Sequence, residues 1–212
     1  MSLVSPYKDI VQYTKIQLLP HHMNSDIRTN MKLNLKKKVE KKCNNNGFID
    51  EVYRIVDFED GKLVVENLSG SVNYDIKYEC RICIPVENSI IIGQVKIINQ
   101  ELVMLINGPL YIFIPKDNIN SNLWNINENF LNKDNNKKLK EGHFVKVRII
   151  NKKINQNDYQ IKCIGELLDF ASENEIEKNF GSIINENNSN EYVEEENNEK
   201  NSDDENKSNF II

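Results

Sequence analysis

The sequence predicts an α+β, mainly β protein in two parts: one helix packed on antiparallel strands, followed by a barrel of five short strands. Three observations favour this architecture. One lysine-rich segment has the apolar spacing of a helix, most of residues 48–164 alternates with the period of strands, and Gly, Pro and Asn separate the runs. A chain of 212 residues is long enough for two small domains, each with a modest core.

The helix is expected from about Asn30 to Cys43. Met31, Leu35 and Val39 lie four residues apart and would form one apolar stripe on it. Asn30 is a suitable N-cap because its side-chain oxygen can accept from a free backbone N–H of the first turn. The lysines around the stripe are Lys36, Lys37, Lys38, Lys41 and Lys42. We interpret them as a solvated face near the helix C-terminus rather than as a phosphate-binding stripe.

Three strands follow the helix and complete the first part, a small domain that we expect to span residues 1–86. They are predicted over residues 48–56, 62–66 and 72–85. Asp60-Gly61 lies between the first two strands and is a strong hairpin signal. Leu68-Ser69-Gly70 is expected to form the next loop. One helix on a few antiparallel strands makes a small α+β unit.

Five short strands make up the second part, which we expect over residues 87–170. They are predicted at residues 90–98, 102–106, 110–114, 144–150 and 159–164, with a long insertion at about residues 118–141. This arrangement suits an OB fold. In the turn Asn107-Gly108-Pro109, Gly108 would adopt a positive φ. The run 102–106 is apolar at every position, which predicts that the first domain or a partner subunit covers its outer face.

Charge is divided unevenly along the chain, whose net charge is −5. Residues 171–212 carry 12 Asp or Glu and 3 Lys, so residues 1–170 have a mildly positive balance. Apolar residues become sparse in the C-terminal stretch, which we therefore expect to be a disordered acidic tail. The weak positive balance of the remainder is compatible with nucleic acid without requiring it.

No arrangement of residues predicts catalysis, a bound metal or a cofactor. Cys80 and Cys83 form a CxxC pair, but residues three apart in a strand point to opposite faces and would not share one ion. His21, His22 and His143 have no neighbouring Ser, Cys or carboxylate in the pattern of a triad. We therefore expect a binding protein without its own active site.

The barrel offers a better case for binding. Lys146 and Arg148 alternate with apolar residues on one predicted strand and Lys162 lies on the next, so one face is expected to be basic. Tyr111 and Phe113 share one side of the third barrel strand. They would stack on bases if that side faces solvent, and would pack in the core if it faces inward. The sequence leaves both alternatives open.

Several segments, in their order and spacing, resemble one family. They are KKKVEKKC at the end of the helix, GFIDEVYRIVD and YDIKYECRICIP in the first part, and NGPLYIFIPKDNI and NDYQIKCIGELLD in the barrel. Over about residues 18–169 the chain resembles the stalk subunits of multisubunit DNA-directed RNA polymerases. This family comprises the seventh subunit of eukaryotic RNA polymerase II and its counterpart in the archaeal polymerase.

The resemblance implies a non-catalytic polymerase subunit that assists initiation. Its tip domain would dock on the clamp region of the large polymerase subunits, and its OB domain would contact nascent single-stranded RNA. Carried over by position, the docking residues would be Asn30, Asp57, Asp60, Gly61, Leu68 and Gly70. The RNA-binding residues would be Lys146, Arg148, Lys162, Tyr111 and Phe113. Whether a fourth-subunit-like stalk partner accompanies the protein is left open.

Two departures from the family pattern predict that RNA binding is weak. Relatives often have a glycine and an aromatic residue where this chain has Asn99-Gln100-Glu101, and a histidine where it has Pro115. The remaining cations would neutralise phosphates without reading bases, so binding should be salt-sensitive and sequence-tolerant. The acidic tail lies outside the family pattern, and would either compete with RNA for the basic face or recruit a basic partner.

A second class of function stays open, a free-standing RNA-binding OB protein of translation or RNA turnover. Such a protein would have no need of the loops around Gly61 and Gly70. The Asn-rich sequence fits an AT-rich protist, or a large DNA virus that encodes its own polymerase. The N-terminus lacks a secretory signal, and no run reaches the about 18 apolar residues of a membrane span. We therefore expect an intracellular protein without a membrane partner, in the nucleus or, if viral, in the cytoplasmic viral factory and virion.

Overall fold

The computed structural model describes residues 3–63, 69–125, 130–133 and 136–180. The chain divides into one compact unit up to Phe170 and a second unit from Ala171 onward. The first unit contains both a sheet and a barrel, so the predicted domain division after residue 86 stays a prediction.

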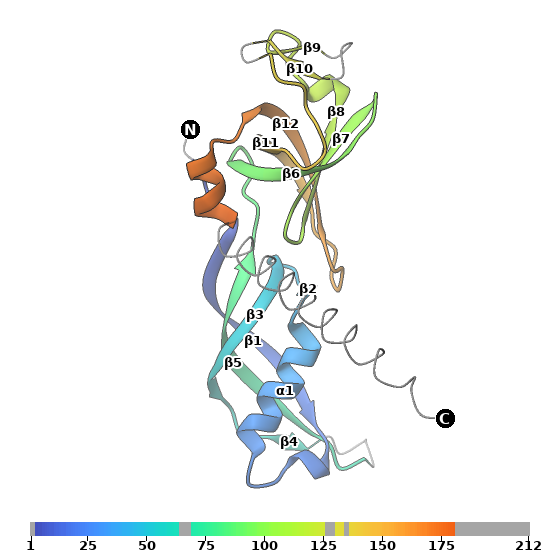
Figure 1. Ribbon diagram of the computed structural model, residues 1–212. Coiled ribbons are helices and arrows are strands. Elements are labelled where there is room, and N and C mark those ends of the chain that lie inside the picture. The colour runs from blue at the N-terminus through green and yellow to red at the C-terminus, as the bar shows by residue number, and fades with distance from the viewer. Residues whose placement is uncertain (1–2, 64–68, 126–129, 134–135, 181–212) are drawn as a thin grey trace, which may run out of the picture. The chain divides into compact units, whose positions relative to one another are not determined.

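An antiparallel sheet with one helix forms the first part of this unit, as predicted (Figure 1). The strands lie in the order β1 (Tyr7–Leu18), β5 (Val72–Cys83), β3 (Phe48–Phe58) and β2 (Lys42–Cys43). The short η1 (Pro20–His22) leads from β1 to α1 (Ile27–Val39), which packs against β1 and β3. Met31 and Leu35 of α1 are fully buried, so the predicted apolar stripe faces the sheet.

The edge strand β1 is missing from the sequence-based prediction, although it pairs with β5 along its whole length. The register runs from Tyr7 opposite Cys83 to Leu18 opposite Val72. The buried positions of β1 include Leu18, but also Gln12, a polar side chain that is only 6% exposed. Gln12 interrupts the alternation of apolar and polar residues by which a strand is normally identified.

The hairpin predicted at Asp60-Gly61 is wrong. β3 pairs with β5 as far as Phe58 opposite Ile76. The short β4 (Lys62–Leu63) then continues along the same edge of β5, beginning opposite Asn73. Asp60-Gly61 is therefore an interruption in one edge of the sheet rather than a turn between two paired strands.

The predicted five-stranded barrel is confirmed. It closes in the order β11 (Phe144–Lys153), β12 (Ile161–Phe170), β8 (Leu110–Pro115), β7 (Leu102–Asn107) and β6 (Ile90–Ile98). β12 and β8 are parallel, and the other neighbours are antiparallel. Gly108 has a φ of 55° in the turn between β7 and β8, as predicted. Val145, Val147 and Ile149 of β11 are fully buried, whereas the residues between them face outward.

The insertion between β8 and β11 contains η2 (Lys116–Asn118) and the paired strands β9 (Trp124–Asn125) and β10 (Leu131–Asn132). Trp124 is buried, and its Nε1–H donates to the carbonyl oxygen of Leu168 at 3.1 Å. The indole therefore anchors the insertion to the last barrel strand.

The sheet and the barrel share backbone contacts and a buried cluster. The N–H of Cys43 donates to the Asp158 carbonyl oxygen at 2.7 Å, and the Asn157 N–H donates to the Cys43 carbonyl oxygen at 2.8 Å. Cys43, Phe48 and Cys83 belong to the same buried cluster as the inward residues of the barrel. The barrel core therefore extends into the end of the sheet.

In the second unit, residues 173–180 are helical, where the sequence-based expectation was disorder. At its start the Ser172 N–H donates to Glu175 Oε2 at 2.9 Å, which is one half of a capping box, and the Ser172 Oγ–H donates to the same oxygen at 2.8 Å. The remainder of the predicted acidic tail, residues 181–212, lies outside the described residues. No helix in the described part of the chain is long and apolar enough to cross a membrane.

Because the cysteines are buried, the free energy of unfolding is expected to fall as the pH becomes alkaline. Desolvation raises the pKa of Cys43 and Cys80 to about 11, that of Cys163 to about 12, and that of Cys83 as well. In the unfolded chain a thiol ionises near pH ~8.5. Stability from these neutral thiols is therefore complete below that pH and declines as pH rises toward about 11.

We expect the free energy of unfolding in urea to fall progressively between pH 8 and pH 10.5. A Cys80→Ala variant should lose less over this interval than the unsubstituted protein, because it has one buried thiol fewer. Equal pH dependence of the two proteins would contradict the assignment.

Candidate docking and nucleic-acid surfaces

Predicted docking residues lie at the end of the sheet where β4, η1 and the start of α1 meet, which we call the tip end (Figure 1). The prediction that Asn30 is the N-cap is wrong, because α1 starts at Ile27 and Asp26 takes the cap position. Asn30 lies one turn inside the helix, and its Nδ2–H groups donate to the His22 carbonyl oxygen and to Asn24 Oδ1, both at 3.0 Å. Its side chain thus fixes the segment after η1 to α1.

Two glycines of the tip end stand where a side chain would collide, at Gly61, or be strained and crowded, at Gly70. A Cβ on Gly61 would lie 2.4 Å from Cγ1 of Val72 and 2.7 Å from Cζ of Tyr74. Gly70 has a φ of 64°, and a Cβ there would lie 3.2 Å from Cγ of Pro20. Both predicted docking glycines therefore permit close approach of chain segments, a structural role that stands beside any role in docking.

An aromatic cluster connects the strands of the tip end to the helix. The Arg28 guanidinium carbon lies 5.5 Å from the centre of the Phe58 ring, on which the Tyr74 ring stands edge-on at 6.4 Å. The Tyr74 hydroxyl reaches Sδ of Met23 at 4.0 Å. Strands β3 and β5, helix α1 and the segment after η1 are thus held together where the docking surface is expected.

Of the other predicted docking residues, Asp57 and Asp60 are exposed at the tip end. Asp57 is exposed near the end of β3, and its Oδ1 accepts from the Phe58 N–H at 2.9 Å. Asp60 is exposed in the interruption between β3 and β4. Leu68 lies outside the described residues. Two leucines that the sequence-based prediction omitted are exposed here, Leu63 by 63% and Leu19 by 40%.

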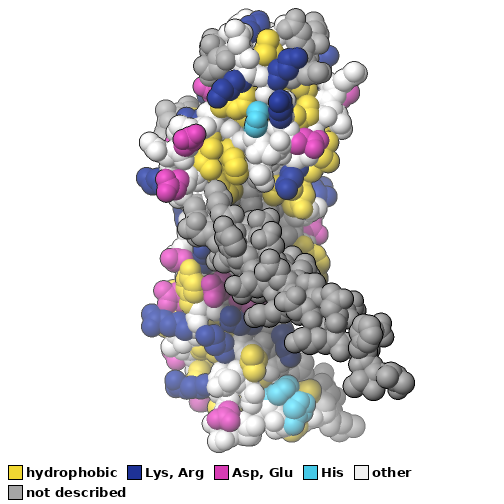
Figure 2. All heavy atoms as spheres, viewed as in Figure 1, with side chains coloured by type: hydrophobic (Ala, Val, Ile, Leu, Met, Phe, Trp, Pro, Cys, Tyr) yellow, Lys and Arg dark blue, Asp and Glu magenta, His cyan; other side chains and the backbone are white. Residues whose placement is uncertain are grey.

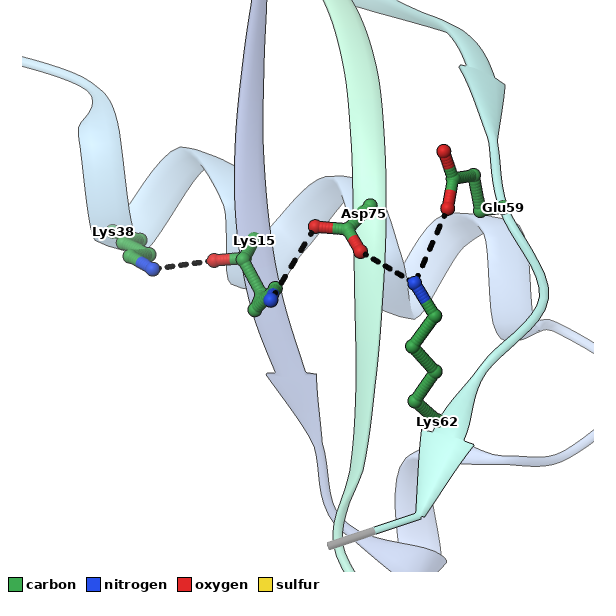
Figure 3. A network of polar contacts seen from close by, with 5 residues as sticks. All are labelled: Lys15, Lys38, Glu59, Lys62 and Asp75. Atoms are coloured by element: carbon green, nitrogen blue, oxygen red, sulfur yellow. Dashed lines mark hydrogen bonds and ion pairs between the residues drawn. The ribbon is translucent and has the colours of Figure 1, made fainter.

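A line of polar contacts crosses the sheet close to the tip end (Figure 3). The Asp75 carboxylate contacts Nζ of Lys15 at 3.8 Å and Nζ of Lys62 at 3.3 Å. Glu59 contacts the same Lys62 ammonium at 3.4 Å, and the Asp75 and Glu59 carboxylates raise the pKa of Lys62. At the other end, Nζ of Lys38 donates to the Lys15 carbonyl oxygen. These exposed contacts align α1, β1, β5 and β4 while adding little stability each.

The lysine-rich face of α1 is partly neutralised by its neighbours. Figure 2 shows Lys and Arg side chains gathered on the face of the sheet that carries α1. On the helix, Lys36 lies 3.3 Å from Glu40. The expected helix end at Cys43 is wrong, because α1 ends at Val39 and Lys42 and Cys43 form β2. Lys41, between the two elements, lies 2.7 Å from Asp50. The expectation of a solvated face with local pairs, rather than a dedicated phosphate stripe, fits these contacts.

The aromatic residues of β8 face outward, which answers the question that the sequence left open. Tyr111 and Phe113 are half-buried on the outer side of the barrel, between inward residues that are fully buried. Lys162 of β12 lies opposite Tyr111, and Met104 of β7 lies opposite Phe113. We call the outward residues Met104, Ile106, Tyr111, Phe113, Lys162 and Ile164 the β8 patch. It is an apolar surface with Lys162 at its side, and the exposed Lys153 of β11 lies opposite Lys162.

The structure separates Lys146 and Arg148 from this patch. Arg148 Nη1 contacts Glu166 Oε2 at 2.9 Å, and Lys146 lies opposite Asp169 in the register of β11 and β12. At ~3.3 Å per residue, Asp169 lies roughly 23 Å along the strand from Lys162, and Glu166 lies roughly 13 Å from it. The five predicted RNA-binding residues therefore form two groups, and acids of β12 oppose the cations of the second. The sequence-based prediction overlooked these acids because it did not include the register of β12.

The cysteines of the CxxC pair lie in different buried clusters. Cys80 packs in the core under α1, whereas Cys83 packs in the cluster continuous with the barrel. All four cysteines are unpaired and buried. Among the described residues, no group of three or more His, Cys, Asp or Glu side chains is placed to hold a metal ion.

Comparison with known proteins identifies the family. No known family profile matches the sequence. A putative DNA-directed RNA polymerase subunit of Acanthamoeba polyphaga mimivirus is 38% identical over 163 residues, covering 76% of this chain and 82% of that protein. RPB7 of RNA polymerase II from Glycine max and subunit 7 from Arabidopsis thaliana are 26% and 25% identical, each over 76% of this chain and 91% of the relative. The chain therefore belongs to the family of RNA polymerase stalk subunits that includes subunit 7 of RNA polymerase II.

Proposed function

We propose that this RNA polymerase subunit docks on the clamp region of the large polymerase subunits through its tip end. The observation that carries the proposal is the pair of exposed leucines on a well-connected frame. Leu63 lies opposite Val72 on one side of β5, and Leu18, which precedes Leu19, lies opposite Val72 on the other. Exposed apolar side chains gathered at one end of a protein favour a protein–protein contact.

Replacing Leu63 by Glu tests this docking surface. We expect the variant to keep its thermal stability, because the side chain is 63% exposed and packs little. Its affinity for the polymerase lacking this subunit should fall by about tenfold or more, since a charge would replace an apolar contact in the proposed interface. The measurement is co-purification of the large subunits with tagged protein, followed by titration.

Ile150→Glu is the matched control, because Ile150 is 44% exposed on the barrel. This variant should bind the polymerase like the unsubstituted protein. If Leu63→Glu and Ile150→Glu co-purify the large subunits equally well, the tip end is not the docking surface.

We further propose that the β8 patch contacts nascent single-stranded RNA. Tyr111 and Phe113 lie half-buried on the outer surface, and Lys162 lies opposite Tyr111 on the neighbouring strand. Stacking on aromatic rings next to a cation is the common way in which OB folds hold single strands. Lys146 and Arg148 should contribute less, because Asp169 and Glu166 lie opposite them.

Single-stranded RNA binding should respond to the two groups of cations differently. Lys162→Ala should weaken binding of an unstructured oligonucleotide and reduce the dependence of log K on log salt by about 0.7, the value for one phosphate contact. Tyr111→Ala should weaken it by roughly 1–3 kcal/mol if one base stacks there. Fluorescence anisotropy at several salt concentrations measures both effects.

Lys146→Ala serves as the charge-matched control. An equal loss of affinity in Lys146→Ala and Lys162→Ala would contradict this assignment.

A free-standing RNA-binding protein is the alternative function, and the two proposals separate experimentally. A free-standing protein would keep its cellular role when Leu63 is replaced, whereas a polymerase subunit would lose it together with the large subunits. The mimivirus relative supports a viral origin and a location with the transcription machinery, in the viral factory and virion. The plant relatives support the nuclear alternative.

A further inference from the structure

A group of exposed lysines lies on the insertion between β8 and β11, and neither the docking nor the RNA-binding proposal uses it. We call Lys137, Lys138 and Lys140 the insertion lysines, and all three are exposed. Figure 2 shows Lys and Arg side chains on the part of the barrel that carries β9 and β10.

The insertion is attached to the barrel far from the cation of the β8 patch. Its anchor, Trp124, donates to the carbonyl oxygen of Leu168 on β12. At ~3.3 Å per residue, Leu168 lies roughly 20 Å along that strand from Lys162. The insertion lysines therefore need a ligand of their own, or none.

The backbone that carries the insertion lysines is fixed by its neighbours. The carbonyl oxygen of Lys137 accepts from the Asn132 N–H at 3.0 Å. The Lys140 N–H donates to Nδ1 of His143 at 3.3 Å, and its carbonyl oxygen accepts from the His143 N–H at 3.2 Å. Leu139, between the lysines, is buried. Lysines on a held segment lose less conformational entropy when they bind a ligand, because their backbone is already ordered.

No acidic side chain forms an ion pair with the insertion lysines in the part of the chain that the structure describes. The described acids of the insertion are Asp117 and Glu141, whereas Glu128 and Asp134 lie outside the described residues. The lysine-rich face of α1 differs in this respect, since it carries local ion pairs. The positive charge of the insertion lysines is thus available to a ligand.

The surroundings of the insertion lysines indicate the kind of ligand. Among the described residues of the insertion, no large apolar side chain is exposed, and the aromatic residues Trp124 and Phe130 are buried. Protein interfaces are enriched in aromatic residues and depleted in lysine. Single strands are held by bases that stack on exposed rings. A base-paired duplex keeps its bases stacked and presents phosphates outward, so a ligand of this class can be held by lysines alone.

We propose that the insertion lysines bind the phosphate backbone of a DNA duplex. Contacts to phosphate carry no sequence information, so the binding is independent of sequence. We name DNA because the relatives of this chain are subunits of DNA-directed RNA polymerases. The duplex would occupy a different surface from RNA on the β8 patch.

The experiment titrates the full chain into a short labelled DNA duplex of mixed sequence and follows fluorescence anisotropy at several salt concentrations. If each of the three lysines contacts one phosphate, affinity should fall roughly 40-fold between about 50 and 200 mM salt, at ~0.9 in log K per contact. The amide resonances of residues 137–140 should shift when the duplex is added. An RNA duplex of the same sequence is the comparison, and tighter binding of the RNA duplex than of the DNA duplex would overturn the choice of DNA.

The decisive variant replaces all three insertion lysines by Gln, as Lys137→Gln, Lys138→Gln and Lys140→Gln. Its thermal stability should not change, because the side chains are exposed. Affinity for the DNA duplex should fall by about tenfold or more at low salt, and the slope of log K against log salt should decrease by about 2.7. Binding of single-stranded RNA should stay unchanged, which separates this proposal from the one on the β8 patch. The charge-retaining variant with Arg at the three positions should bind the duplex like the unsubstituted protein.

The matched control removes the same charge from the exposed lysines at the end of α1 and just after it, as Lys37→Gln, Lys38→Gln and Lys41→Gln. This control should bind the duplex like the unsubstituted protein. Equal losses in the two Gln variants would show an effect of net charge alone and would refute the assignment. Unchanged duplex affinity in the variant without insertion lysines would refute it as well.

Discussion

The pairing of β5 on both of its edges holds the first unit together. β1 covers one edge from end to end, while β3 and then β4 follow the other. Side chains of β5 also reach two cores, because Cys80 packs under α1 and Cys83 packs in the cluster that continues into the barrel. A disturbance of this single strand would therefore reach the tip end and the barrel alike. Elements paired and buried on all sides belong to the last regions of a protein to open.

The barrel was predictable from sequence because its strands alternate cleanly. On β11, Val145 and Val147 face the core while Lys146 between them faces outward, so period and polarity agree. β1 was not predicted because its alternation is broken: the polar Gln12 occupies a buried position. Gln12 is hydrogen-bonded there by Tyr78 and Asn44, which are distant from it in sequence. The hairpin predicted at Asp60-Gly61 was wrong because the same dipeptide suits both a tight turn and an interruption in a strand edge.

For the candidate surfaces, the residue types could be predicted from the sequence, but the residues that lie next to them could be identified only from the fold. Tyr111 and Phe113 could be assigned to the outside only once β8 was paired with β7 and β12. The opposition of Arg148 and Glu166 depends on a register that shifts twice between β11 and β12, and no local pattern reports such shifts. The exposed leucines of the tip end were not singled out from the sequence, because the exposure of an apolar side chain is a property of the folded surface.

The turn between β7 and β8 lies against the first residue of β1, which limits the side chains that both positions can hold. A Cβ on Gly108 would lie 2.2 Å from the Tyr7 hydroxyl oxygen, and the Tyr7 ring in turn lies under the guanidinium of Arg81, 4.4 Å from its centre. The first residue of the sheet and the turn of the barrel thus occupy one shared space. A side chain at position 108 would meet the Tyr7 phenol in addition to the strain of a left-handed backbone, so the turn of the barrel and the start of the sheet constrain each other.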